Sequence, residues 1–214
     1  MVFESREQAA NLLAGRLRAH RGGRPLVLAI PRGAVPMGAI LAAALDGELD
    51  VILVHKLRAP DQPELAIGAV DETGHVELEP FAHELGVSDR HVEAERALQL
   101  DTLRARRAAY TPTRGAIDAA GRVVIVVDDG VATGATMAAA LRTVRAKRPA
   151  RLIAAAAVAS LEAMERLRLA ADEAVVLEIP TEFDAVSLWF ERFPQVSDDE
   201  VMALLGRDHA RPGA

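Results

Sequence analysis

The sequence predicts an α/β fold built on a doubly wound, mostly parallel sheet. Short apolar runs of strand length alternate along the chain with stretches of helical character, which is the pattern of strands joined by helical crossovers. Several of these runs are almost entirely apolar, as expected of strands buried on both faces of a sheet. The length of 214 residues suits one domain with a full core, so we expect a single domain over residues 1–214.

The first elements follow this alternation. Ser5 and Gln8 resemble a capping box, and they open a helix that the glycines at 22–23 end. The next elements are expected as a buried strand at 26–30, a helix at 37–45 and a second buried strand at 49–54.

Residues 57–120 break the alternation and suggest an insertion or flap rather than a second domain. Two strands at 65–70 and 75–78 are joined by a turn. A long polar helix at 88–109 follows and leads into a loop. After this segment, strands are expected at 123–127, 152–159 and 174–179, and helices at 134–148, at 160–171 and after Ser197.

Composition excludes several classes of protein. Half of the residues are hydrophobic, too many for a disordered chain. No cysteine is present for a disulfide scaffold, a thiolate metal site or thiol catalysis. No apolar run approaches the roughly 18–20 residues of a membrane span, and the N-terminus lacks the pattern of a signal peptide. The net charge of −6 argues against nonspecific coating of nucleic acid. We therefore expect a cytoplasmic protein whose partners are neither membrane nor nucleic acid.

Residues 123–137 carry the strongest chemical signal. An apolar strand leads into Asp128 and Asp129, and a loop containing Gly134 then enters a helix. Ligands bind at the carboxyl ends of strands in open α/β sheets, and backbone N–H groups at the start of a helix bind phosphate. Two carboxylates beside such a site suit sugar hydroxyls or Mg²⁺. An ordinary strand–helix connection with Thr133 as the N-cap is the alternative.

The same segment resembles the phosphoribosyl-pyrophosphate (PRPP) signature of type I phosphoribosyltransferases: an apolar strand, two acids, two or three spacers and Thr-Gly-x-Thr. The lysine of a Walker A loop, the GxGxxG of dinucleotide-binding folds and the GxSxG of serine hydrolases are absent. The resemblance covers about 24–203 and points to a bacterial stand-alone subgroup of unassigned base specificity, through residues 31–36, 54–56, 63–70 and 184–198. It implies a sheet of the type I phosphoribosyltransferase kind, with a flap insertion at about 57–120 and a small C-terminal hood at about 180–205.

The resemblance also implies an activity. A pentosyltransferase of nucleotide metabolism would transfer the 5-phosphoribosyl group of PRPP to a nitrogenous base, with release of pyrophosphate, dependence on Mg²⁺ and a homodimeric assembly. One alternative is a regulatory protein on the same fold that senses PRPP or a nucleotide without turnover. Its support in the sequence is a basic stretch at 142–151 that would bind RNA. A phosphohydrolase that uses Asp128 is a third reading, which the Thr-Gly-Ala-Thr context disfavours.

The implied site residues fall into groups. Asp128 and Asp129 would bind the ribose hydroxyls directly or through Mg²⁺-bound water, with no direct protein ligand to the metal beyond these. The 5′-phosphate would be held by Ala132, Thr133, Gly134, Ala135 and Thr136, and the pyrophosphate by Arg32, Gly33 and Ala34.

Two cations and a group of aromatic side chains complete the implied site. Lys56 would contact pyrophosphate, with an exposed strand-end lysine as the alternative. The resemblance implies that one flap arginine reaches the pyrophosphate, with Arg107 as the assigned candidate, although this helix face could instead be solvated and ion-paired. The other arginines that could do so are Arg104, Arg106 and Arg114. A flat base needs a flat apolar partner, and four of the seven aromatic residues lie near the C-terminus. The base-binding candidates are Phe183, Val186 and Trp189, whereas Phe190 and Phe193 are expected to serve packing.

Overall fold

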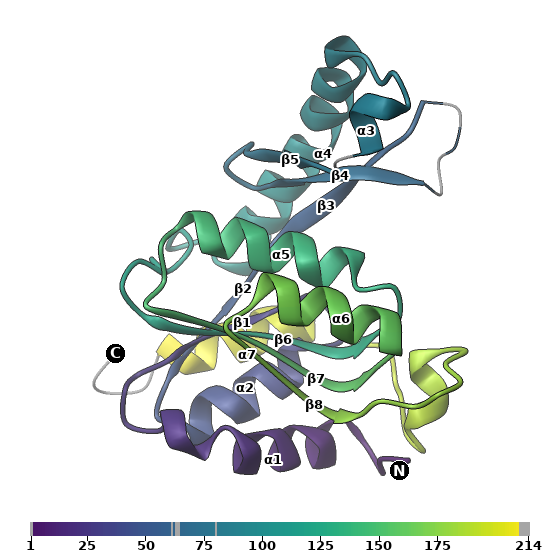
Figure 1. The fold of residues 1–214 in the computed structure, drawn as a ribbon. Coiled ribbons are helices and arrows are strands. Elements are labelled where there is room, and N and C mark those ends of the chain that lie inside the picture. The colour runs from purple at the N-terminus through teal and green to yellow at the C-terminus, as the bar shows by residue number, and fades with distance from the viewer. Residues whose placement is uncertain (1, 61, 63–64, 80, 210–214) are drawn as a thin grey trace.

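A computed structural model of the chain describes residues 2–60, 62, 65–79 and 81–209. Its centre is a five-stranded sheet with the strand order β2-β1-β6-β7-β8 and parallel pairing throughout (Figure 1). This sheet confirms the predicted fold class. Its strands are β1 Leu26–Ala29, β2 Glu48–Val51, β6 Val123–Val131, β7 Arg151–Ala159 and β8 Glu173–Glu178.

Helices cover both faces of this sheet (Figure 1). On one face, α1 contacts β7 and β8, while α2 contacts β1, β2 and β6. On the other face, α5 contacts β6 and β7, and α6 contacts β7 and β8. A further helix, α7, packs on α2 and β2. The helices are α1 Arg6–Arg16, α2 Val35–Ala44, α5 Ala135–Ala146, α6 Leu161–Ala170 and α7 Asp198–His209, with a 3₁₀ turn η1 at Arg18–His20.

Local sequence signals account for where several helices begin. Ser5 accepts a hydrogen bond from the Gln8 amide at the start of α1, which confirms the predicted cap. The helix α2 begins at Val35, two residues earlier than predicted, because Pro36 fits the first turn, where its missing N–H costs nothing. Ser160 caps α6 through the Ala163 amide, as predicted.

The run expected as a single strand at 49–54 is divided between two sheets. Residues up to Val51 belong to β2, whereas Val54–Arg58 forms β3 of a second, antiparallel sheet with the order β3-β4-β5. An apolar run cannot reveal such a division, because both parts are buried. The remaining elements of this segment are β4 Ala66–Asp71, β5 Val76–Leu78, α3 Phe81–Glu84 and α4 Asp89–Tyr110.

The second sheet and α4 form the segment that we expected to be a flap, and they lie on the α5 side of the main sheet (Figure 1). A fully buried carboxylate, Asp50 of β2, ties them to the body. Arg107 of α4 donates to Asp50 Oδ1 at 2.8 Å, and Arg114 donates to Asp50 Oδ2 at 2.9 Å. The second sheet is therefore attached to the main sheet by buried charge as well as by apolar packing.

The segment after β8 packs against the N-terminus. The Phe3 amide donates to the Trp189 carbonyl at 2.8 Å, close to the 3₁₀ turn η2 at Val186–Trp189. Phe190 is buried between Phe3 and Phe193, at ring-centroid distances of 5.6 and 4.9 Å. The expectation that Phe190 serves packing is confirmed. Within the described residues, no helix is long and apolar enough to cross a membrane.

Candidate active site

The strand β6 continues through both acids and ends at Val131. It is therefore longer than the strand that the sequence predicts at 123–127. The carboxyl groups of Asp128 and Asp129 are close enough to interact, but only one of them lines the neighbouring cavity. Asp128 lines a cavity of about 220 Å³ together with the loop that follows it, whereas Asp129 does not line this cavity. The two acids that the motif places together thus face different surroundings.

The loop of residues 130–136 forms the wall of this cavity beside Asp128. Gly134 is the N-cap of α5 with φ +78°, a left-handed conformation that favours glycine. A Cβ on Gly134 would also lie 3.2 Å from the Ala163 Cα. Ser160 holds the loop from outside by donating to the Ala132 carbonyl at 2.5 Å. The alternative in which Thr133 is the N-cap is therefore wrong.

This loop presents donors suited to a phosphate. The N–H groups in the first turn of a helix have no acceptors within the helix, and the helix dipole places positive potential there. The predicted phosphate-binding residues Ala132, Thr133, Gly134, Ala135 and Thr136 all line the cavity. The structure thus brings the five predicted loop residues and Asp128 together around one space.

The two acids also influence each other electrostatically. Burial, followed by the neighbouring charge of Asp129, raises the pKa of Asp128 well above its usual range. Asp129 faces Arg6, whose Nη2 lies 2.8 Å from Asp129 Oδ2. Sequence reasoning missed Arg6, because it lies 123 residues from Asp129 and belongs to no motif.

The loop after β1 approaches β6 at Asp129. A Cβ on Gly33 would collide with Asp129 Oδ2, so only glycine allows this approach. The peptide bond between Pro31 and Arg32 is cis. Nη1 of Arg32 lies 3.4 Å from Asp198 Oδ2 of α7, and Ala34 is the buried N-cap of α2. Gly33 is thus the member of the predicted pyrophosphate loop that contacts the acidic pair.

The two predicted pyrophosphate cations differ in their surroundings. Lys56 is exposed on β3, lines the cavity of Asp128, and forms no ion pair with a carboxylate of the described residues. Arg107 is half-buried, and its donors are engaged by Glu72, Asp50 and the Val51 carbonyl. The structure therefore assigns Arg107 to the link between the two sheets, and its donors are not directed at the candidate site.

The predicted base-binding residues are only partly brought to the cavity. Val186 lines it and lies against Gly130, where an added Cβ would collide with Val186 Cγ1. Phe183 and Trp189 do not line this cavity. The residue Val186 thus connects η2 with the loop that follows the acids.

In this site the Asp128 carboxylate, near the end of β6, lies beside a loop whose N–H groups suit a phosphate, on a parallel α/β sheet. It agrees with the comparison to known proteins, in which residues 3–188 match the model of the phosphoribosyl transferase domain. The chain belongs to the phosphoribosyl transferase family.

Individual relatives agree with this membership. Two Mycobacterium tuberculosis proteins, from strains CDC 1551 and H37Rv, are each named "Putative phosphoribosyl transferase" and are 37% identical over 97% of this chain. The chain spans 47% of their length. The crystal structure of TT1426 from Thermus thermophilus superposes with a TM-score of 0.87 at 45% identity, covering 96% of this chain and 98% of that one.

Proposed function

We propose that the protein is a phosphoribosyltransferase that transfers the 5-phosphoribosyl group of PRPP to a nitrogenous base and releases pyrophosphate. The observation that carries this proposal is the cavity shared by Asp128 and the loop of residues 130–136. A carboxylate for a sugar and a helix start for a phosphate lie side by side, as a 5-phosphoribosyl group requires. Family membership supports the same chemistry.

The reaction poses an electrostatic problem. A base nitrogen attacks C1′ while pyrophosphate leaves from the opposite side, so the sugar gains positive charge and the leaving group keeps its negative charge. Fixed groups that match both charges lower the barrier. In our proposal the Asp128 carboxylate orients the ribose hydroxyls and opposes the positive charge of the sugar, while Lys56 and the loop of Arg32 stabilise the departing pyrophosphate.

The loop residues would supply orientation. A 5′-phosphate held by backbone N–H groups and the hydroxyls of Thr133 and Thr136 fixes one end of the substrate. Asp128 fixes the ring, so that C1′ is presented to the nucleophile in a defined position. Val186 covers the cavity from the side of η2 and is the candidate contact for the base. We retain Phe183 and Trp189 as candidates that would have to turn toward the base when it binds.

The residues present fit a magnesium ion. A carboxylate oxygen is a ligand that Mg²⁺ accepts, and this ion takes much of its shell from substrate phosphates and water. Asp128 would hold it directly or through water at the cavity wall. When bound, Mg²⁺ would neutralise charge on the pyrophosphate.

A base panel tests the proposal. The protein is incubated with PRPP, Mg²⁺ and individual purine and pyrimidine bases, and the release of pyrophosphate is measured. We expect release with at least one base, and a loss on the order of 100-fold in kcat for Asp128→Asn, the size seen when a stabilising group is removed. The matched control is Asp101→Asn, at an exposed position of α4. PRPP binding without pyrophosphate release from any base would contradict the proposal.

That contrary result would favour the regulatory alternative, but its support in the sequence has weakened. Three arginines of the basic stretch at 142–151 are ion-paired within the molecule. Arg142 pairs with Glu77 and Glu79, Arg145 pairs with Asp172, and Arg151 pairs with Glu173. This neutralisation removes much of the positive charge that a phosphate backbone would need.

A further inference from the structure

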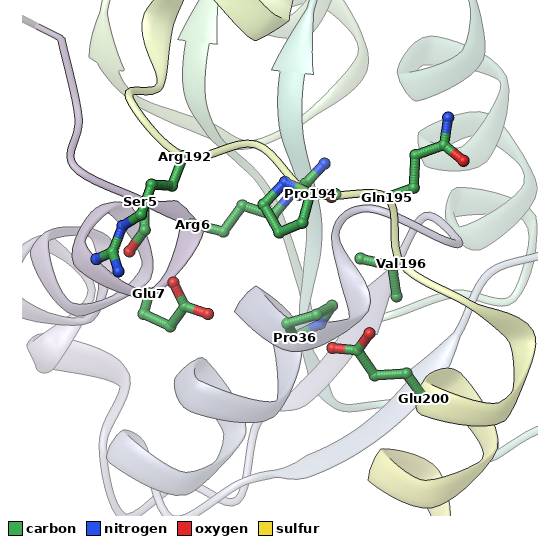
Figure 2. Close-up of a pocket in the computed structure, with 9 residues that line it drawn as sticks. All are labelled: Ser5, Arg6, Glu7, Pro36, Arg192, Pro194, Gln195, Val196 and Glu200. Carbon is green, nitrogen blue, oxygen red and sulfur yellow. The ribbon is translucent and has the colours of Figure 1, made fainter.

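Arg6 is a buried cation at the junction of three segments. It belongs to the first turn of α1 and is only 7% exposed. Figure 2 shows it extending from α1 toward Pro194, at the wall of a cavity of about 190 Å³. This cavity is separate from the one that Asp128 lines. Arg6 thus does not line the cavity of Asp128.

Every nitrogen of the Arg6 guanidinium has a partner. Nε donates to Asp129 Oδ2 at 2.8 Å, and Nη2 lies 2.8 Å from the same oxygen. Nη1 donates to the Pro194 carbonyl at 2.7 Å. The guanidinium carbon lies 3.7 Å from the centroid of the Phe193 ring, a cation–π contact. One side chain therefore joins α1, the end of β6 and the segment after η2.

The Asp129 carboxylate is confined by these contacts. Its Oδ2 accepts from Arg6, and Gly33 approaches the same oxygen so closely that an added Cβ would collide with it. Gly33 also lies close to Arg6, whose Nη2 would be 3.1 Å from that Cβ. The carboxylate of Asp129 thus contacts the pyrophosphate-type loop and α1, while Asp128 alone faces the cavity.

We propose that Arg6 is a positioning residue of the phosphoribosyl site, acting through Asp129. Arg6 holds Asp129 between α1 and Gly33, and this fixes the end of β6 from which Asp128 projects and the loop that receives pyrophosphate. The two acids then have different roles: Asp128 contacts substrate, and Asp129 carries the connection to Arg6. This inference rests on the proposed function and adds a residue that the signature does not contain.

The geometry of arginine is essential to this role. Its planar fork offers donors in several fixed directions, whereas a lysine ammonium is a compact charge without a flat face. A lysine at position 6 would keep a cation near Asp129, but it would lose the simultaneous hydrogen bond to Pro194 and the stacking on Phe193. Arg6→Lys therefore separates the link to Asp129 from the link to the segment after η2.

The test compares Arg6→Gln, Arg6→Lys, Asp129→Asn and the double variant Arg6→Gln/Asp129→Asn. Each protein is checked for native far-UV circular dichroism and for the fraction of active sites, and kcat and KM for PRPP are then measured. We expect Arg6→Gln to lower kcat by about 10- to 100-fold, as for residues that orient a catalytic ligand. KM for PRPP should rise by a smaller factor than kcat falls, because the pyrophosphate loop is loosened while the 5′-phosphate loop is untouched. Arg6→Lys should recover part of kcat.

The double variant distinguishes positioning from a general loss of stability. If Arg6 acts through Asp129, the double variant should have about the same kcat as the less active single variant, because either single substitution already removes the interaction between Arg6 and Asp129. The inference would be overturned if the loss of kcat in the double variant equalled the product of the two single losses. It would also be overturned if a folded Arg6→Gln protein kept the full kcat. The matched control is Arg192→Gln, which lines the same cavity but pairs with the exposed Glu4 and should retain wild-type kcat.

The sole tryptophan supplies a second measurement. Trp189 ends η2, four residues before Phe193, so its emission reports on this segment. We expect altered emission in both Arg6 variants and unchanged emission in Arg192→Gln. If the wild-type protein binds PRPP but releases no pyrophosphate, the proposed function fails. The Arg6 inference is then tested by PRPP affinity: it holds if the double variant binds PRPP about as well as the weaker-binding single variant, and it fails if the two losses of affinity multiply. If the wild-type protein binds no PRPP, both are overturned.

Discussion

At the scale of single residues, Tyr110 links the end of α4 to α7. Its hydroxyl donates to Asp198, and Asp198 also pairs with Arg32 of the loop after β1. Burial first, and then this hydrogen bond, raise the pKa of Tyr110 to about 12. The folded state therefore favours the protonated phenol, and this contribution to stability is complete below the unfolded pKa of about 10. It is lost as the pH rises through about 12.

Titration of the phenol tests this link, because Tyr110 is the only tyrosine of the chain. The absorbance of tyrosinate should rise with a midpoint near pH 12 in the folded protein. Asp198→Asn should lower the midpoint only in part, since burial is the larger cause. Full denaturation should return it to about 10. A midpoint near 10 while far-UV circular dichroism is still native would contradict the assignment.

Single residues also mark where sequence reasoning succeeds and where it stops. Asp128 and the loop to Thr136 could be found because they are consecutive, and a strand followed by a helix places them around one cavity. The pairing of Arg6 with Asp129 could not be found, because it joins α1 to β6 across 123 residues. The continuation of β6 through Asp128 and Asp129 could not be found either, because the apolar run ends at Val127.

At the scale of elements, the main correction concerns Arg107 of α4. The polar face of a long helix is compatible with solvent, with ion pairs or with substrate, and its sequence does not distinguish these. The deciding group is Asp50, which is buried in β2 and needs two cations to remain ionised there. Buried charges require partners from whichever element the fold brings near. Arg107 is therefore committed to Asp50 and Glu72 by tertiary structure.

Acid should weaken this attachment. Burial alone would raise the pKa of Asp50, but Arg107 and Arg114 outweigh it and hold the pKa below its usual value. A carboxylate whose folded pKa is lowered contributes stability above its unfolded pKa of about 4. That contribution is lost as the pH falls from about 4 through the lowered value. The free energy of unfolding, measured by urea denaturation, should therefore decline below about pH 4.

Removing the charge tests the same link at neutral pH. Asp50→Asn leaves two half-buried arginines without the buried counter-ion that they share and should destabilise the protein by about 3–5 kcal/mol. The difference from wild type should shrink as the pH falls below about 4, where Asp50 itself becomes protonated. The control is Asp46→Asn, which breaks an exposed pair with Arg21 and should change stability little. Equal effects of the two substitutions at neutral pH would refute the role of Asp50.

At the scale of the whole molecule, the predicted α/β class was within reach of the sequence because buried parallel strands leave continuous apolar runs. The second sheet could not be predicted from the sequence, because the length and apolarity of a strand do not indicate which sheet it joins. One hydrophobic cluster nevertheless spans both sheets. It includes Leu57 of β3, Ile67 of β4 and Leu103 of α4, together with Leu13 of α1 and Leu41 of α2.

This shared cluster predicts that the chain unfolds as a single cooperative unit, as one domain over 1–214 would. Tyr110 reports on the end of α4, and Trp189 reports on the segment after β8, so tyrosine absorbance and tryptophan fluorescence follow two different segments. Their urea midpoints should coincide with each other and with far-UV circular dichroism. Leu57→Ala, which leaves a cavity in the second sheet, should lower all three midpoints together, by about 2–5 kcal/mol in stability. An earlier transition at Tyr110, with Trp189 still native, would show that the second sheet and α4 unfold independently.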